Sequence, residues 1–212
     1  MAFTVVQDQQ QHKAAICVRS LDNSYSDKLL ENGDWVWTWS PDGQYLLYKW
    51  GVLRRVRSLD LVSGRRSEFL QDPNQQVYQP FFSSDGRWIA FLASSGIFVA
   101  PYRGAAAVAK RDWIQIIASA GNFPDKPRWS PDGARLYFTS DRDGFTCIWT
   151  QRLDPATKRP IGEPTPFYHL HSAEGSLSNV GAALADIAVA RDRLIFPQTD
   201  LTGNIWMIHS RK

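Results

Sequence analysis

The chain has 212 residues, of which 43% are hydrophobic and 21% charged, so it can bury a core and is not compositionally disordered. Its formal net charge of +3 is too small to indicate nucleic-acid binding. Its two cysteines exclude a disulfide-stapled scaffold and a four-cysteine zinc site.

No apolar run approaches the roughly 18 residues that a membrane-spanning helix needs. The first residues, Met1 to Lys13, lack the basic start and the apolar stretch of a signal peptide. We therefore expect no membrane span. A cytoplasmic location is favoured, and a periplasmic one stays open if the chain continues before Met1.

Short strands are predicted from the start of the chain, at 3–6, 14–21 and 27–30. Three segments then align without gaps, beginning at Trp39, Phe82 and Trp129 and therefore 43 and 47 residues apart. Each reads aromatic, Ser, Pro or Ser, Asp, Gly, two variable residues, Leu or Ile, one variable residue, then Phe or Tyr. The Asp-Gly pair is typical of a hairpin turn, and the alternation after it predicts a strand. This spacing is that of a propeller blade.

Each copy continues with a third and a fourth predicted strand. The third is clearest at Cys147–Leu153, and the fourth lies near Ser67–Leu70 or Thr165–Tyr168. The stretch from Gly104 to Trp113 is less regular because alanines dilute the pattern. The chain closes with predicted strands at 184–190, 192–197 and 204–209.

These units predict an all-β fold, a β-propeller of four-stranded antiparallel blades with three complete blades and two incomplete terminal ones. We expect one domain over 1–212, divided into a partial blade, three blades and a partial blade at 1–32, 33–76, 77–122, 123–170 and 183–212. Because neither end supplies the strand that the other lacks, we expect an open arc or part of a longer propeller. The rival is a closed ring in which 3–6 pairs with 204–209.

The string from Trp129 to Asp154 contains the motifs Trp-Ser-Pro-Asp-Gly, Phe-Thr-Ser-Asp-Arg-Asp-Gly, Ile-Trp and Leu-Asp. With these motifs it resembles the WD-like repeat of TolB-type β-propeller proteins. The stretch from Arg152 onward looks like the closing repeats of large bacterial members of that family. The resemblance implies the fold and a habit of binding protein partners. In some members the propeller follows a kinase or DNA-binding domain.

Several residues are of types that can carry chemistry. The segment Asp141–Gly144 resembles part of a calcium loop but is predicted to be a hairpin turn. His169 and His171 lie two apart, on one face of a strand, and could hold two corners of a metal site. Cys17 and Cys147 are predicted to be packed on third strands. The arginines at 54, 55, 57, 65 and 66 are interpreted as a solvated face rather than a nucleic-acid stripe.

The loops that join second to third strands, and each blade to the next, should gather on one face of a propeller. That face is the predicted binding surface. Its segments are Gln7–Gln11, Trp50–Arg54, Gln71–Gln79, Ala120–Lys126, Asp141–Gly144 and His169–Asn179. Its candidate partner contacts are Trp50, Asp141, Arg142, Asp143, His169 and His171.

The leading hypothesis is a non-catalytic protein-interaction module, since neither a Gly-x-Ser-x-Gly motif nor a Walker loop occurs. No cofactor, catalytic residue or metal ligand is assigned, and no nucleic-acid partner is expected. A protein partner is expected, together with self-association through unpaired blade edges. The alternatives are a small-ligand or metal-binding propeller, and a sensory fragment of a larger kinase or DNA-binding protein.

Overall fold

The computed structural model describes residues 2–8, 13–19, 22, 26–31, 35–50, 55–104, 106–170, 177 and 186–198, with backbone alone for 3–8, 13–14, 26–31 and 50. These residues are organised as separate antiparallel sheets. No α-helix occurs among them, and a 3-10 turn, η1 (Lys110–Asp112), lies in the irregular alanine-rich stretch. The predicted fold class is therefore confirmed.

Three sheets have four strands each, and every strand pairs with its neighbours in sequence. We call them the first, second and third complete blades. The first contains β4 (Val36–Trp39), β5 (Tyr45–Trp50), β6 (Arg55–Asp60) and β7 (Arg66–Leu70). The second contains β8 (Val77–Phe82), β9 (Trp88–Ala93), β10 (Gly96–Pro101) and β11 (Ile114–Ala118). The third contains β12 (Asp125–Trp129), β13 (Arg135–Ser140), β14 (Cys147–Leu153) and β15 (Pro160–Tyr168).

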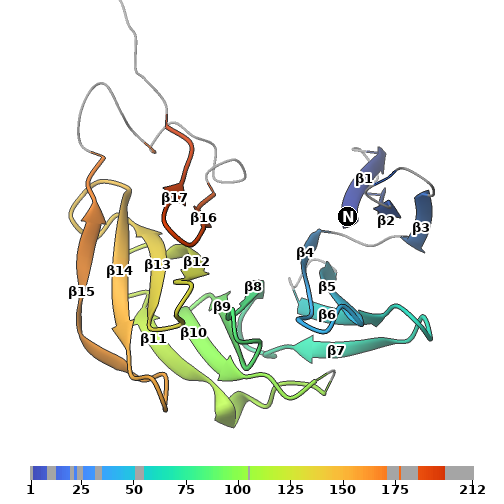
Figure 1. The fold of residues 1–212 in the computed structure, drawn as a ribbon, viewed down its shortest axis with the longest axis horizontal. Coiled ribbons are helices and arrows are strands. Elements are labelled where there is room, and N and C mark those ends of the chain that lie inside the picture. Colours follow the sequence, from blue (N-terminus) through green and yellow to red (C-terminus); the bar gives the residue numbers. More distant parts are fainter. Residues whose placement is uncertain are drawn as a thin grey trace, which may run out of the picture.

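Smaller sheets flank the complete blades. The first of them contains β1 (Ala2–Asp8), β2 (Lys13–Arg19) and β3 (Ser26–Glu31), and the last contains β16 (Ala188–Val189) and β17 (Leu194–Ile195). The strand expected at 204–209 lies outside the described residues, and so does the pairing that would close a ring. Among the described residues, the two flanking sheets are separate and the blades form an open arc (Figure 1).

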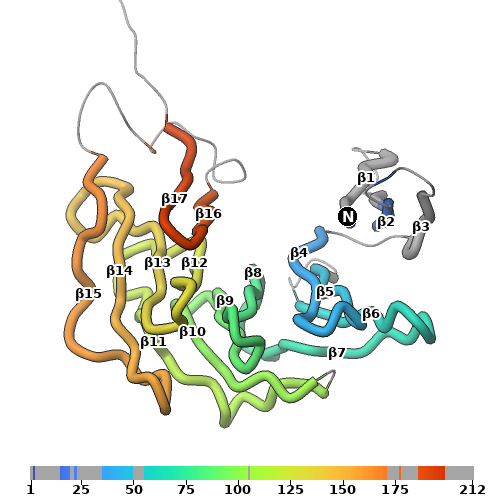
Figure 2. Tube along the Cα trace, viewed as in Figure 1, coloured from blue at the N-terminus to red at the C-terminus, as the bar shows by residue number. Residues whose placement is uncertain are grey.

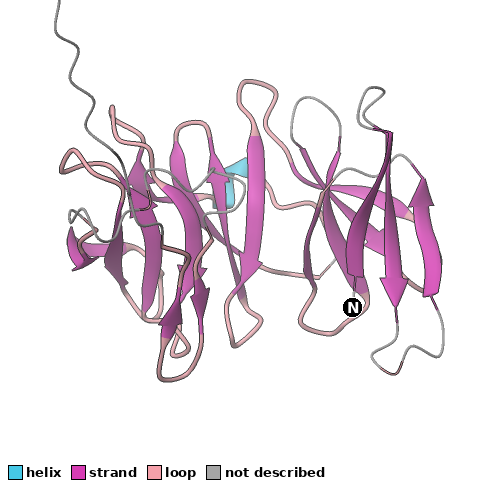
Figure 3. Cartoon of the chain, turned by 90° about the horizontal axis from the view of Figure 1, so that it is seen from above, coloured by secondary structure: helices cyan, strands magenta, loops and turns pink. Residues whose placement is uncertain are grey.

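The first strands of the blades, β4, β8 and β12, lie on the inner side of this arc, and β7, β11 and β15 lie outside (Figure 1). The tube in Figure 2 follows the blades around the arc in sequence order. Seen from above, the strands cross the thickness of the arc and the loops gather at two opposite faces (Figure 3).

The repeated turn has the same hydrogen bonds in all three copies. Its Ser hydroxyl donates to the Asp carboxylate at 2.5–2.6 Å, and the Gly N–H donates to the Ser carbonyl at 2.9 Å. The three glycines, Gly43, Gly86 and Gly133, have φ of 69°, 67° and 65°, a region that disfavours side chains. The Asp-Gly pair in the sequence is therefore required by the turn geometry.

Neighbouring turns also contact one another. The Ser84 hydroxyl of the second complete blade donates to the carbonyl of Pro131 in the third at 2.5 Å. A Cβ placed on Gly86 would lie 2.9 Å from the ring of Pro41 in the first complete blade. The repeated turns are therefore packed against one another across neighbouring blades.

The strand after each turn sends alternate side chains into two different interfaces. Tyr48, Phe91 and Phe138 are all fully buried, and each faces the preceding sheet. On the first complete blade, Leu46 and Tyr48 pack against Ile16 of β2, while Leu47 packs with Phe91 of the second complete blade. Apolar burial therefore joins each sheet to the next, as period-two alternation requires.

The carboxylates of the repeated turns predict a dependence of stability on acid. The hydrogen bond from Ser83 is the main reason that the pKa of Asp85 falls to about 2, and equivalent bonds lower the pKa of Asp42 and Asp132. An unfolded Asp has a pKa of about 3.9, so the folded protein binds fewer protons in this range. The stabilisation is complete above about pH 5 and is lost as the pH falls from about 4 toward 2.

We expect the urea concentration at the unfolding midpoint to be lower at about pH 3 than at about pH 6. This decrease should be smaller in Asp85→Asn. Urea unfolding followed by tryptophan fluorescence measures both midpoints. A midpoint in the original protein that does not change over this range would contradict the assignment.

Candidate functional site

The predicted turn at Asp141–Gly144 joins β13 to β14. The Gly144 N–H donates to the Asp141 carbonyl at 2.8 Å, which confirms the hairpin turn. The Asp141 carboxylate accepts from the backbone N–H of Phe123 at 2.9 Å. Asp141 therefore fixes the loop that precedes β12.

Arg142 packs against aromatic rings of its own blade. Its guanidinium carbon lies 4.9 Å from the Trp149 ring and 5.4 Å from the Phe138 ring, within the range of cation–π attraction. Burial lowers the pKa of Arg142. These contacts hold the turn against the blade.

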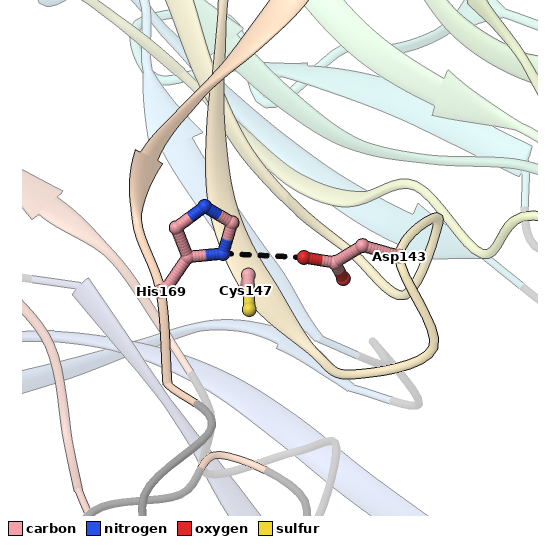
Figure 4. Close-up of side chains that lie close together, drawn as sticks. All are labelled: Asp143, Cys147 and His169. Carbon is pink, nitrogen blue, oxygen red and sulfur yellow. Dashed lines mark ion pairs between the residues drawn. The ribbon is translucent and has the colours of Figure 1, made fainter.

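Asp143, Cys147 and His169 form a side-chain cluster at the same end of the third complete blade (Figure 4). One ligand atom from each lies within 4.8 Å of the other two. The His169 Nδ1 atom is 3.2 Å from Oδ2 of Asp143, and the Cys147 sulfur accepts from the Leu170 N–H at 3.4 Å. Cys147 is fully buried, whereas the His169 side chain is half exposed.

Strand pairing explains why these three residues meet. Cys147 is the first residue of β14 and pairs with Ser140, so it follows directly on the turn that carries Asp143. Its neighbour Ile148 pairs with Tyr168 on β15, which brings His169 beside Cys147. Trp149 supports the imidazole from the side, with ring centroids 6.2 Å apart.

The protonation state of the thiol limits its chemistry. Burial is the main reason that the pKa of Cys147 is raised, and the negative charge of Asp143 raises it further. A protonated and fully buried thiol is a poor nucleophile, because the thiolate is the reactive form and a substrate must reach it. Burial therefore disfavours Cys147 as a nucleophile, although a histidine and a carboxylate lie beside it.

Two of the predicted contact residues cannot be placed at this site. Trp50 ends β5, but its side chain lies outside the described residues, and His171 lies outside them altogether. The juxtaposition expected between His169 and His171 therefore stays a prediction.

A pocket of about 820 Å³ lies among the inner strands of the three complete blades. It is lined mainly by aromatic and charged side chains. The aromatic ones are Trp35, Trp37, Tyr78, Phe81 and Phe123, and the charged ones are Lys49, Asp125, Lys126, Arg128 and Asp186. Two of the predicted loop segments, 71–79 and 120–126, contribute to it, but its aromatic and charged lining was not predicted.

Arg128 is held rigidly in the wall of this pocket. Its guanidinium lies over the Phe81 ring, 3.4 Å from the centroid, and forms an ion pair with Asp186. Only 12% of the side chain is exposed, and burial lowers the pKa of Arg128. The charge is positioned before any ligand arrives.

Two adjacent blades carry the same strained backbone conformation in this pocket. Gln79 and Lys126 have φ of 54° and 55°, both precede a proline, and both lie at a bulge of an inner strand. The Lys126 N–H donates to the Gln79 side-chain oxygen at 3.2 Å, which links the blades. Left-handed conformations of such residues are costly and concentrate at functional sites.

Comparison with solved structures supports the propeller interpretation. TolB from Acinetobacter baumannii matches 94% of this chain and 49% of its own at 20% identity, with a TM-score of 0.60. A putative TolB from Agrobacterium tumefaciens matches 79% of this chain and 60% of its own at 19% identity, with a TM-score of 0.59. The fold is a TolB-like β-propeller. The chain thus spans about half to three-fifths of the length of these TolB chains, and the likeness concerns the fold alone.

An enzyme shares this propeller fold. The periplasmic gluconolactonase of Pseudomonas aeruginosa matches 85% of this chain and 57% of its own at 18% identity, with a TM-score of 0.56. The prediction that the chain is not an enzyme is therefore wrong, because the same fold carries catalysis elsewhere and the absence of two sequence motifs does not exclude it.

No family model and no curated protein matches the sequence. Within the described part of the chain, no helix has the length and apolar character needed to cross a membrane. The preference for the cytoplasm has no support from these neighbours, one of which is named as periplasmic.

Proposed function

We propose that the propeller is a protein-binding module that receives a segment of a partner protein in the pocket among its inner strands. The observation that carries this proposal is the paired strain at Gln79 and Lys126. Two blades hold the same unfavourable backbone conformation at one pocket, and such conformations concentrate at functional sites.

The lining of the pocket fits a peptide segment. Trp35 and Phe123 contribute to it while remaining 53% and 74% exposed, so large aromatic surfaces are available to a partner. Aromatic residues and arginine are enriched where proteins bind one another. Asp143, one of the contacts predicted from sequence, lies in the same turn as Asp141, whose carboxylate accepts from the Phe123 N–H.

The pocket also contains an unsatisfied donor. Trp37 lines it, and the buried indole N–H of Trp37 has no hydrogen-bond partner among the described residues. Leaving a buried donor unpaired costs free energy, so the carbonyl of a bound segment would stabilise a rotamer of Trp37 that turns the N–H toward the pocket. Rigid placement of Arg128 lowers the ordering cost of binding.

Photo-crosslinking in the cells that make the protein tests this proposal. A benzoylphenylalanine at position 123 should yield a covalent adduct with a partner protein, and the same group at position 62 should not. Val62 is the matched control because it is 92% exposed, does not line the pocket, and lies in the β6–β7 turn, which bonds to the repeated turn of its blade through the Leu61 N–H and the Gln44 carbonyl. Equal adducts at both positions, or none at position 123, would exclude this pocket as the binding site.

A second variant tests the indole donor. Trp37→Phe keeps an aromatic ring in the wall but removes the N–H, so we expect the yield of the position-123 adduct to fall about ten-fold. A variant that keeps its unfolding midpoint and its full adduct yield would show that the N–H does not contact the partner.

A further inference from the structure

We infer that Asp143, Cys147 and His169 form a binding site for a divalent zinc ion at the edge of the third complete blade. The three side chains offer one sulfur, one imidazole nitrogen and one carboxylate oxygen, which are the ligand types that zinc takes from proteins. This site goes beyond the proposed protein-binding pocket and does not depend on it.

The distances are those of a site that needs little adjustment. Ligand atoms around one tetrahedral zinc lie roughly 3.3–3.6 Å apart, given zinc bonds of about 2.0–2.3 Å. The Nδ1 and Oδ2 atoms of His169 and Asp143 are 3.2 Å apart, and all three ligand atoms lie within 4.8 Å. Asp143 sits on a turn and His169 follows the last residue of β15, so rotation of these two side chains closes the remaining gap.

Charge balance favours a divalent ion here. On binding, the Cys147 thiol releases its proton to solvent and becomes a thiolate, Asp143 binds as its carboxylate, and the imidazole binds in its neutral form. The two negative ligands cancel the charge of Zn²⁺, so the partly buried site becomes electrically neutral.

The burial of the ligands sets the place of the remaining coordination position. Cys147 anchors the ion from the interior, while Asp143 and His169 reach it from the exposed side. Three protein ligands with a fourth position open to water are the arrangement of zinc sites that bind or activate a small molecule, whereas structural sites close all four positions.

Cobalt spectroscopy tests this site directly. The full chain is stripped of metal with a chelator, kept reduced, and titrated with Co²⁺. We expect a thiolate-to-cobalt charge-transfer band, tetrahedral bands in the visible range, and loss of both on addition of one equivalent of Zn²⁺. Cys17→Ala, which removes the other cysteine, should leave the bands unchanged, and Cys147→Ala should abolish them.

The exposed ligands keep the test independent of folding. Asp143→Asn and His169→Asn lie at the surface and should weaken Zn²⁺ binding at least about ten-fold by calorimetry, with an unchanged near-ultraviolet circular dichroism spectrum. An octahedral cobalt spectrum without a thiolate band would overturn the proposal. So would a thiolate band that persists in Cys147→Ala, or Zn²⁺ binding that is unaffected in both surface variants.

Discussion

Replacing Trp129 with alanine should lower the free energy of unfolding by about 3–5 kcal/mol, because a large ring is removed from a packed interface. Trp129 is 7% exposed and belongs to the cluster between the second and third complete blades. Its indole N–H donates to the carbonyl of Phe81 on the neighbouring blade at 3.0 Å. The change therefore leaves a cavity and breaks a hydrogen bond that joins two sheets. Urea unfolding at constant m value measures the loss.

Two further variants separate these contributions. Trp129→Phe keeps a six-membered ring but removes the N–H and the pyrrole part of the indole, so the loss should be smaller than in Trp129→Ala, with about 1 kcal/mol from the hydrogen bond. Trp35→Ala removes an indole that is 53% exposed and should change stability by about 0.5 kcal/mol or less. Similar losses in Trp129→Ala and Trp35→Ala would refute the assignment of Trp129 to an interface between blades.

Gly96→Ala should destabilise the second complete blade by roughly 2–6 kcal/mol, the sum of backbone strain and steric overlap. Gly96 begins β10 with a φ of 137°, and a Cβ there would lie 1.9 Å from the carbonyl oxygen of Ile117. Ile117 belongs to β11, which pairs with β10, so the overlap involves backbone and no side-chain rotation relieves it.

Gly43→Ala provides the matched control for this prediction. Gly43 also has a positive φ, of 69°, but a Cβ there would meet no atom within 4 Å. It should lose only about 1 kcal/mol, from backbone strain. Urea unfolding of the two variants compares backbone strain with steric overlap to backbone strain alone. Equal losses of unfolding free energy would show that the strand pairing at Gly96 tolerates a side chain.

Local pattern was sufficient to predict much of the fold. The third strand predicted at Cys147–Leu153 coincides with β14, and the fourth predicted at Ser67–Leu70 differs from β7 by one residue. Both predictions rest on a turn with Asp and Gly followed by alternating apolar residues, and such signals are complete within a few residues of sequence. The pairing that would close a ring, between 3–6 and 204–209, stays a prediction because 204–209 lies outside the described residues.

The cluster of Asp143, Cys147 and His169 on the third complete blade was missed because it depends on strand register. The prediction placed His169 beside His171 and treated Cys147 as packing. Cys147 meets His169 through a pairing of β14 with β15 that has two irregularities, one between Tyr168 and Pro166 and a bulge between Thr165 and Ile161 that contains Gly162, where φ is 66°. The Gln151 amide fixes this bulge by donating to the carbonyls of Ile161 and Gly162. Counting residues around the hairpin from Cys147 would have suggested the contact, but the bulge shifts such a count.

The inner pocket was missed for a different reason. Gln79 and Lys126 precede prolines, which normally favours an extended backbone, and nothing local predicts a left-handed residue there. The conformation follows from the bulges of the inner strands and from the contact between neighbouring blades. Pro80 and Pro127 stand at matching positions of the repeat, and that correspondence is the signal that could have been used.

The main apolar cores of the protein lie between adjacent sheets, and each strand after a repeated turn divides its side chains between two of them. Such a chain behaves as a row of units coupled to their nearest neighbours. Duplication or loss of one whole unit during evolution would restore the same contacts at the new junction. A chain built in this way can therefore change length in steps of one blade while its other junctions keep their original sequence.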